Sequence, residues 1–163
     1  MRSLNSYILT FLRSTIVVFL ERLTTYAPLP SKHIGYLGTL YEVATSANAE
    51  IRLRFYNVAL RDPTSSAALD FTDQALKWVT GRDGTGVIKG RMKFCRPTFQ
   101  AASRVNAALA REYFARSKEE FHPIARKLIE KVSARQSLAK HRLLTAWKGS
   151  RLCIDGDQTR KVF

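Results

Sequence analysis

Cysteine is scarce in this sequence of 163 residues. There are two, Cys95 and Cys153, and they lie far apart in the chain. Two distant cysteines form neither a disulfide framework nor the close spacing of a zinc site. Such sparse cysteine usage is typical of a protein in a reducing compartment, so we expect a cytoplasmic location.

Residues that could hold a metal ion or carry out covalent catalysis are also few. His33, His122 and His141 are never paired four residues apart, and no His-Glu-x-x-His sequence occurs. Each histidine is better explained as a cap or a surface residue than as a zinc ligand. Cys95 has basic neighbours but no nearby base, so we interpret it as a structural cysteine. The sequence therefore predicts no catalytic residue, no metal site and no cofactor in this chain.

The N-terminal apolar segment is too short to cross a membrane. Residues 7–20 form a run of fourteen residues that Arg13 interrupts, whereas a membrane-spanning helix needs about 20. A signal peptide is the other possibility, but no small-residue cleavage site follows before Glu21. A buried or interface helix is the better interpretation.

Acidic residues are about half as numerous as basic ones. There are 13 Asp and Glu against 27 Lys and Arg, which gives a net charge of +14. Such an excess attracts an anionic partner: nucleic acid, a membrane surface, a carboxylate ligand or an acidic protein. Residues 135–163 hold seven of the basic residues and two of the acidic ones. We interpret this stretch as a disordered basic tail rather than a binding arm.

Helical periodicity runs through most of the chain. Apolar residues recur at spacings of three and four, and prolines, glycines or capping residues separate the runs. The pattern predicts about seven helices of 10–18 residues and no strand. The expected boundaries are an end near Thr25, caps at Ser31, Asn48 and Asp62-Pro63, a glycine stop at Gly81, a short helix from Pro97, a helix over 104–121 and another after His122-Pro123.

The predicted fold is all-α. Short connections favour antiparallel neighbours, which stack either as an α-α superhelix or as an irregular helical bundle. Residues 51–55 alternate like a strand, but Ile51, Phe55 and Val58 also share a helix face. Because the flanking segments are helical and no hairpin partner is visible, we interpret this segment as a helix.

Residues 90–94, with the sequence Gly-Arg-Met-Lys-Phe, are the strongest candidate for a binding site. They follow a glycine-rich loop over residues 81–86. That loop lacks the spacing of either common phosphate-binding motif, so we interpret it as a surface loop.

The two cations of this segment are spaced to meet one ligand. If the backbone is extended, Arg91 and Lys93 project to one side while Met92 and Phe94 anchor the other. Such a pair suits a carboxylate, because arginine can hold both oxygens and lysine adds a point charge. On these residues alone, however, a solvated basic loop is the favoured interpretation.

Several motifs, in the same order, resemble those of a known family. They are Pro-Leu-Pro at 28–30 with His-Ile at 33–34, Asn-Ala-Glu-Ile-Arg-Leu-Arg-Phe at 48–55, Gly-Arg-Met-Lys-Phe at 90–94 with Arg-Pro at 96–97, and His-Pro at 122–123. Over about residues 19–134 the chain resembles the C-terminal helical domain of leukotriene A4 hydrolase and related zinc aminopeptidases.

The resemblance carries expectations about fold and function. It implies an α-α superhelix in which Arg91 and Lys93, supported by Gly90, Met92 and Phe94, bind the carboxylate of a peptide or of a fatty-acid epoxide. It also implies that the zinc, its ligands and the catalytic tyrosine belong to a separate domain. We therefore expect this chain alone to be inactive. It is either a truncated product whose catalytic domain is lost or a separate chain that docks on a catalytic-domain partner.

The expected organisation has three parts. Residues 1–25 form an apolar helix that lies partly outside the family pattern, with 8–18 as an insertion. Residues 26–134 form the helical domain, and 135–163 form the basic tail. The alternative function is a basic helical module that binds RNA or an acidic protein partner, although no aromatic-basic nucleic-acid motif is present.

Overall fold

The computed structural model describes residues 2–132, with side chains from residue 13 onward. The predicted tail, His141 and Cys153 lie outside the described residues. Within them the backbone is helical and contains no strand, so the all-α prediction is confirmed. The elements are α1 (Arg2–Leu23), α2 (Ser31–Leu40), α3 (Ala49–Ala59), α4 (Ser66–Val79), α5 (Met92–Val105), α6 (Ala107–Ser117), a 3-10 turn (Lys118–Glu120) and a helical stretch over 123–132.

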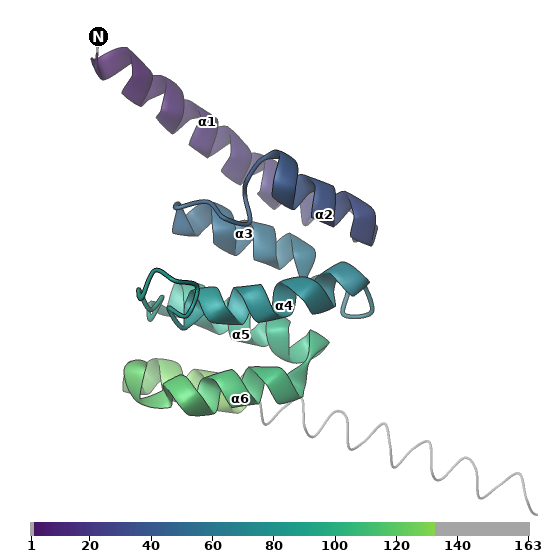
Figure 1. The fold of residues 1–163 in the computed structure, drawn as a ribbon, viewed down its shortest axis with the longest axis vertical. Helices are drawn as coiled ribbons and strands as arrows, with labels where there is room; N and C mark the ends of the chain where they lie inside the picture. Colours follow the sequence, from purple (N-terminus) through teal and green to yellow (C-terminus); the bar gives the residue numbers. More distant parts are fainter. Residues whose placement is uncertain (1, 133–163) are drawn as a thin grey trace, which may run out of the picture.

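The helices stack in layers along the long axis of the molecule (Figure 1). α1 and α2 lie at one end, α3 follows, then α4 with α5, and α6 lies at the other end. The most extensive helix contacts are those of α4 with α5, α1 with α3, and α5 with α6. The helices therefore pack antiparallel in a layered stack, as expected for an all-α domain of paired helices.

A chain of aromatic side chains joins the central helices. Tyr56 on α3 contacts Trp78 on α4, with ring centroids 5.5 Å apart, and Trp78 meets Phe94 on α5 edge-on at 6.0 Å. Tyr56 and Trp78 are almost completely buried. Burying a large apolar side chain stabilises a fold by about 1.5–3 kcal/mol, so these contacts tie the three helices into one core.

α3 is a helix, as predicted, and not a strand. Asn48 caps it, because its side-chain oxygen accepts a hydrogen bond from the Glu50 amide at 2.9 Å. Both of its apolar faces are buried, since α3 packs against α1, α2, α4 and α5. This burial on several sides explains the apparent alternation in the sequence.

Two predicted caps are wrong. Ser31 is already inside α2, and its hydroxyl forms a 2.8 Å hydrogen bond with the hydroxyl of Ser65. Asp62 does not begin α4, because its carboxylate accepts a 2.9 Å hydrogen bond from the Thr64 amide in a local turn. α4 begins four residues after Asp62. Short polar side chains often form such local turns in place of a cap.

The predicted helix over 104–121 is divided at Asn106. This residue is extended, with φ −141° and ψ 91°, and its side-chain oxygen accepts a 3.1 Å hydrogen bond from the Leu109 amide. Asn106 therefore ends α5 and caps α6. The break before the last helix is confirmed: the His122 ring nitrogen Nδ1 accepts a 3.3 Å hydrogen bond from the Ile124 amide.

Candidate carboxylate-binding site

The glycine-rich loop begins with a regular helix stop. Gly81 follows α4 with φ +71°, a conformation that favours glycine. Its amide bonds the Trp78 carbonyl at 3.3 Å, and the Arg82 amide bonds the Lys77 carbonyl at 2.8 Å. This pair of bonds is the Schellman arrangement, so the predicted stop at Gly81 is confirmed.

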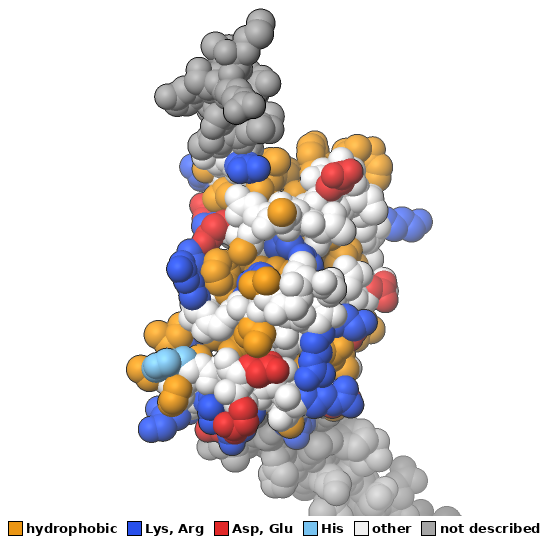
Figure 2. All heavy atoms as spheres, turned by 60° about the vertical axis from the view of Figure 1, so that its left-hand side comes forward, with side chains coloured by type: hydrophobic (Ala, Val, Ile, Leu, Met, Phe, Trp, Pro, Cys, Tyr) orange, Lys and Arg blue, Asp and Glu red, His pale blue; other side chains and the backbone are white. Residues whose placement is uncertain are grey.

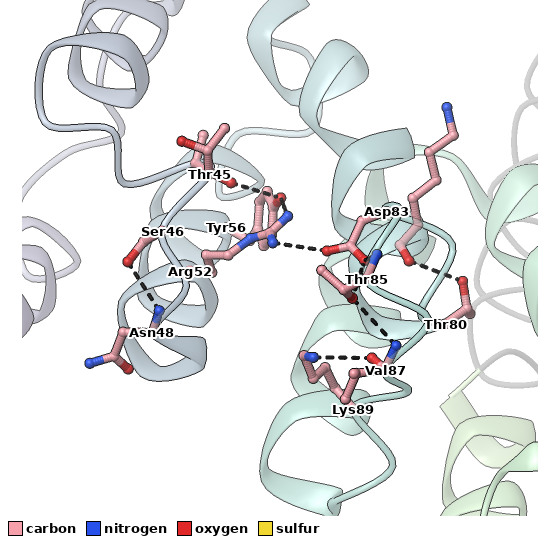
Figure 3. Close-up of polar contacts among 12 residues, drawn as sticks. Thr45, Ser46, Asn48, Arg52, Tyr56, Thr80, Asp83, Thr85, Val87 and Lys89 are labelled. Carbon is pink, nitrogen blue, oxygen red and sulfur yellow. Dashed lines mark hydrogen bonds and ion pairs between the residues drawn. The ribbon is translucent and has the colours of Figure 1, made fainter.

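An ion pair from α3 holds this loop in place (Figure 3). Arg52 donates from Nη1 to Oδ2 of Asp83 at 2.9 Å, and the two side chains are only 14% and 9% exposed. Asp83 also accepts hydrogen bonds from the amide and hydroxyl of Thr85. Burial raises the pKa of Asp83, but the hydrogen bonds from Thr85 and the charge of Arg52 outweigh it and lower that pKa.

The guanidinium of Arg52 is also enclosed by aromatic rings. Its carbon lies 5.6 Å from the Trp78 ring centroid and 5.9 Å from that of Tyr56. These distances suit cation–π attraction. The Nε atom of Arg52 is buried and has no hydrogen-bond partner among residues 13–132. Asp83 and the two aromatic rings together compensate the charge of the guanidinium. The loop that leads to residues 90–94 therefore starts from a fixed position.

The backbone of residues 91–93 is not extended throughout, so the condition set for the pair of Arg91 and Lys93 is met only at Arg91. Arg91 is extended, with φ −64° and ψ 134°, but α5 begins immediately after it at Met92. Lys93 is therefore helical, and Met92 is 47% exposed rather than an anchor. Phe94 does anchor the segment, because it is buried against Trp78.

α5 begins at Met92 because a helix buries this segment well. Phe94 and Thr98 lie four residues apart, as do Cys95 and Phe99, and all four side chains are buried. Pro97 lies inside the helix, where it removes one backbone hydrogen bond, so the expected start at Pro97 is wrong. The burial of neighbouring side chains outweighs this local cost.

Lys93 is held by an acidic residue of α3. Its ammonium group donates to Oε1 of Glu50 in an ion pair. The other oxygen of Glu50 accepts from Arg54 Nη1 at 2.6 Å, and Arg54 Nε donates to Glu21 of α1 at 2.7 Å. The hydrogen bond from Lys93, followed by that from Arg54, lowers the pKa of Glu50. This network links α1, α3 and α5.

Arg91 differs from Lys93 in its electrostatic environment. It is exposed, and its guanidinium makes no ion pair with any side chain between residues 13 and 132. It occupies the position before the first turn of α5, and its own side chain makes no capping hydrogen bond to that helix. The start of a helix attracts anions, and the Arg91 charge adds to this attraction.

The network borders a hollow in the surface. Its volume is about 330 Å³, and it is lined by Glu21, Thr24, Glu50, Leu53, Arg54, Asn57 and Lys93. Sequence reasoning missed Glu50 and Arg54 as members of the site. The distinctive motif at 48–55 contains both residues, but nothing in the sequence indicates that this motif lies beside residues 90–94.

Comparison with known proteins identifies the family. The sequence profile described as "Leukotriene A4 hydrolase, C-terminal" matches residues 11–132. The chain belongs to the leukotriene A4 hydrolase C-terminal family. The match begins inside α1, within the segment 8–18 that was expected to be an insertion.

Fungal aminopeptidases contain related sequences. The chain is similar to "Leucine aminopeptidase 2" of Neurospora crassa, with 32% identity over 71% of this chain, and of Aspergillus terreus, with 37% identity over 71%. The protein of the same name from Yarrowia lipolytica is 30% identical over 76% of this chain. These matches span 16–18% of the length of the relatives. No solved structure shows a significant match.

The zinc that the leukotriene A4 hydrolase family implies does not fit the described part of this chain. Between residues 13 and 132, no group of three His, Cys, Asp or Glu side chains is arranged to hold a metal ion. Cys95 is buried, and burial raises the pKa of its thiol, which disfavours the reactive thiolate.

The helices within residues 2–132 are too short or too polar to cross a membrane.

Proposed function

We propose that this chain is the C-terminal domain of a leukotriene A4 hydrolase-like zinc aminopeptidase and contributes recognition of the substrate carboxylate. The catalytic zinc domain lies outside this chain, as a further part of the enzyme or as a partner. Arg91 and Lys93 bind the carboxylate of a short peptide or fatty acid, and neither forms or breaks a bond. Their role is to orient the substrate.

The observation that carries this proposal is the exposed guanidinium of Arg91 at the start of α5, which forms no ion pair with the side chains of residues 13–132. A planar guanidinium can hold both oxygens of a carboxylate, and the helix start adds further attraction. The buried ion pair between Arg52 and Asp83 holds the loop that leads to Arg91. The family match supports the assignment because it covers α2 to α6 completely.

Peptide binding tests the proposal. A tripeptide with a free C-terminal carboxylate is titrated into the purified chain and followed by NMR, beside the same peptide with an amidated C-terminus. We expect only the free carboxylate to bind, and Arg91→Gln to weaken binding at least tenfold. Arg96→Gln is the matched control, because Arg96 is an exposed cation of α5 in no ion pair with a described residue. Equal losses in both variants would contradict the proposal.

The chain alone should not hydrolyse peptides. An amino-acyl chromogenic substrate measures turnover, and metal analysis of the same sample measures zinc. We expect neither turnover nor stoichiometric zinc, because the described residues offer no zinc site. Turnover together with one zinc per chain would refute the absence of a catalytic centre.

A second candidate function is binding of RNA or an acidic protein. The net charge of +14 favours it. On the face shown in Figure 2, however, acidic side chains lie among the basic ones, so no continuous basic surface forms there. Deleting residues 135–163 should abolish RNA binding if the basic tail is responsible. Unchanged affinity at several salt concentrations would exclude the tail as the site.

A further inference from the structure

Glu50 connects the proposed site to the body of the domain. Each of its two carboxylate oxygens takes part in an ion pair, one with Lys93 and the other with Arg54. Arg91 has no such partner among the side chains of residues 13–132. The two cations proposed to share a ligand are therefore unequal: one is free, and the other already has a carboxylate.

We infer that Glu50 is an internal counterion that a ligand carboxylate displaces from Lys93, so that Glu50 sets the affinity of the site. This inference rests on the proposed function of Arg91 and Lys93. The ligand first meets the exposed guanidinium of Arg91, which has no acidic partner within the described part of the chain. Lys93 then exchanges the Glu50 carboxylate for the chemically equivalent carboxylate of the ligand.

The exposure of this ion pair makes the exchange feasible. The Lys93 and Glu50 side chains are 53% and 35% exposed, whereas those of Arg52 and Asp83 are 14% and 9% exposed. Water screens an exposed pair, which contributes little to stability, while a buried pair is costly to separate. The Arg52–Asp83 pair is therefore suited to holding the loop, and the Lys93–Glu50 pair is suited to opening.

Arg54 limits the cost of the exchange. When Lys93 leaves, Glu50 keeps its 2.6 Å contact with Arg54, so its charge is not left without a partner. Arg54 in turn keeps its 2.7 Å contact with Glu21. A hollow of about 330 Å³ lies beside Lys93, Glu50 and Arg54, so the Lys93 side chain has space to leave Glu50.

The variant Glu50→Gln tests the inference. It removes both the competing charge and the repulsion of the incoming carboxylate, so the free-carboxylate tripeptide should bind about two- to fivefold more tightly. Glu21→Gln is the matched control, because it changes the net charge equally and contacts Arg54 but not Lys93. Its effect on affinity should be clearly smaller. Circular dichroism confirms that each variant folds.

A double variant distinguishes displacement of Glu50 from Lys93 from a general effect of removing a negative charge. In a Lys93→Met background, Glu50→Gln should raise affinity clearly less than it does in wild type, because no ammonium group remains to be released and only the repulsion of the ligand carboxylate is removed. NMR titration of the Glu50 carboxyl gives a second measure: Lys93→Met and saturation with peptide should both raise its pKa. Wild-type binding that depends on Arg91 but not on Glu50 would overturn the inference and leave the proposed function intact. Absence of peptide binding in wild type and Glu50→Gln alike would overturn both.

Discussion

Individual glycines have opposite effects in this fold. Gly81 has φ +71°, and an added Cβ atom would lie 3.0 Å from the backbone of Val87 and Ile88. Gly35 lies inside α2, where an added Cβ atom would meet nothing within 4 Å. The first glycine is required by backbone geometry and by close approach of the chain. The second only weakens its helix.

Alanine substitutions should separate these two cases. Gly81→Ala should lower the free energy of unfolding by about 1–2 kcal/mol, because alanine is strained in this conformation. Gly35→Ala should raise it by up to about 1 kcal/mol through better helix propensity. Urea denaturation measures both, and each variant is the control for the other. Shifts of the same sign would contradict the structural difference.

The phenol of Tyr113 should lose its proton at an unusually high pH. Burial and the nearby carboxylate of Asp73, which accepts a 2.7 Å hydrogen bond from the phenol, raise its pKa to about 12. The folded pKa lies above the unfolded value of about 10. The resulting stability is therefore complete below about pH 10 and is lost as the pH rises through the folded pKa.

Absorbance at 295 nm tests this expectation. The variant Tyr113→Phe should remove a step near pH 12 from the titration of the folded protein and leave the earlier steps in place. Denaturation at neutral pH should show a loss of about 1 kcal/mol from the missing hydrogen bond. If Tyr113→Phe instead removed a step near pH 10, Asp73 and burial would not raise the pKa of Tyr113.

At the scale of elements, the buried ion pair between Arg52 of α3 and Asp83 of the loop after α4 should contribute to stability. Asp83→Asn leaves the buried guanidinium of Arg52 without its counterion and should destabilise the fold by about 3 kcal/mol. Asp70→Asn makes the same chemical change at an exposed position of α4 and is the control. Urea denaturation measures the free energy of unfolding of both variants. Similar small losses in the two would show that the Arg52–Asp83 ion pair contributes little to stability.

The ion pair between Arg52 and Asp83 also predicts how the stability of the fold depends on pH. The folded pKa of Asp83 is lowered, so its contribution is present above the unfolded value of about 3.9 and is lost as the pH falls through the folded pKa. The stability difference between wild type and Asp83→Asn should therefore be largest near neutrality and shrink in acid. A difference that grows as the pH falls would contradict this sign.

At the scale of the whole molecule, the stack should be most stable near its centre. α3 packs against four other helices, whereas α1 packs mainly against α3. Local opening is easiest where few buried contacts hold an element. Hydrogen exchange followed by mass spectrometry should therefore show the strongest protection in α3 and α4 and weaker protection in α1. Uniform protection across these helices would show that the stack opens only as one unit.

Sequence reasoning recovered the helices and the family but only part of the site. Asn48 and Gly81 act locally, so their roles as cap and stop could be read from neighbouring residues. Met92 could not be placed correctly, because Pro97 suggested a later start for α5. That prediction failed because tertiary burial of Phe94 outweighs the local preference of proline.

The sequence by itself determined the all-α class, most helix segments, the family and the candidate cations Arg91 and Lys93. These features depend on periodicity, local turns and motifs, which act over a few residues. The tertiary structure alone decided that Lys93 pairs with Glu50, 43 positions earlier in the chain, while Arg91 stays free of such a pair among the described side chains. Pairing between distant segments depends on how helices stack, and no local pattern in the sequence encodes it.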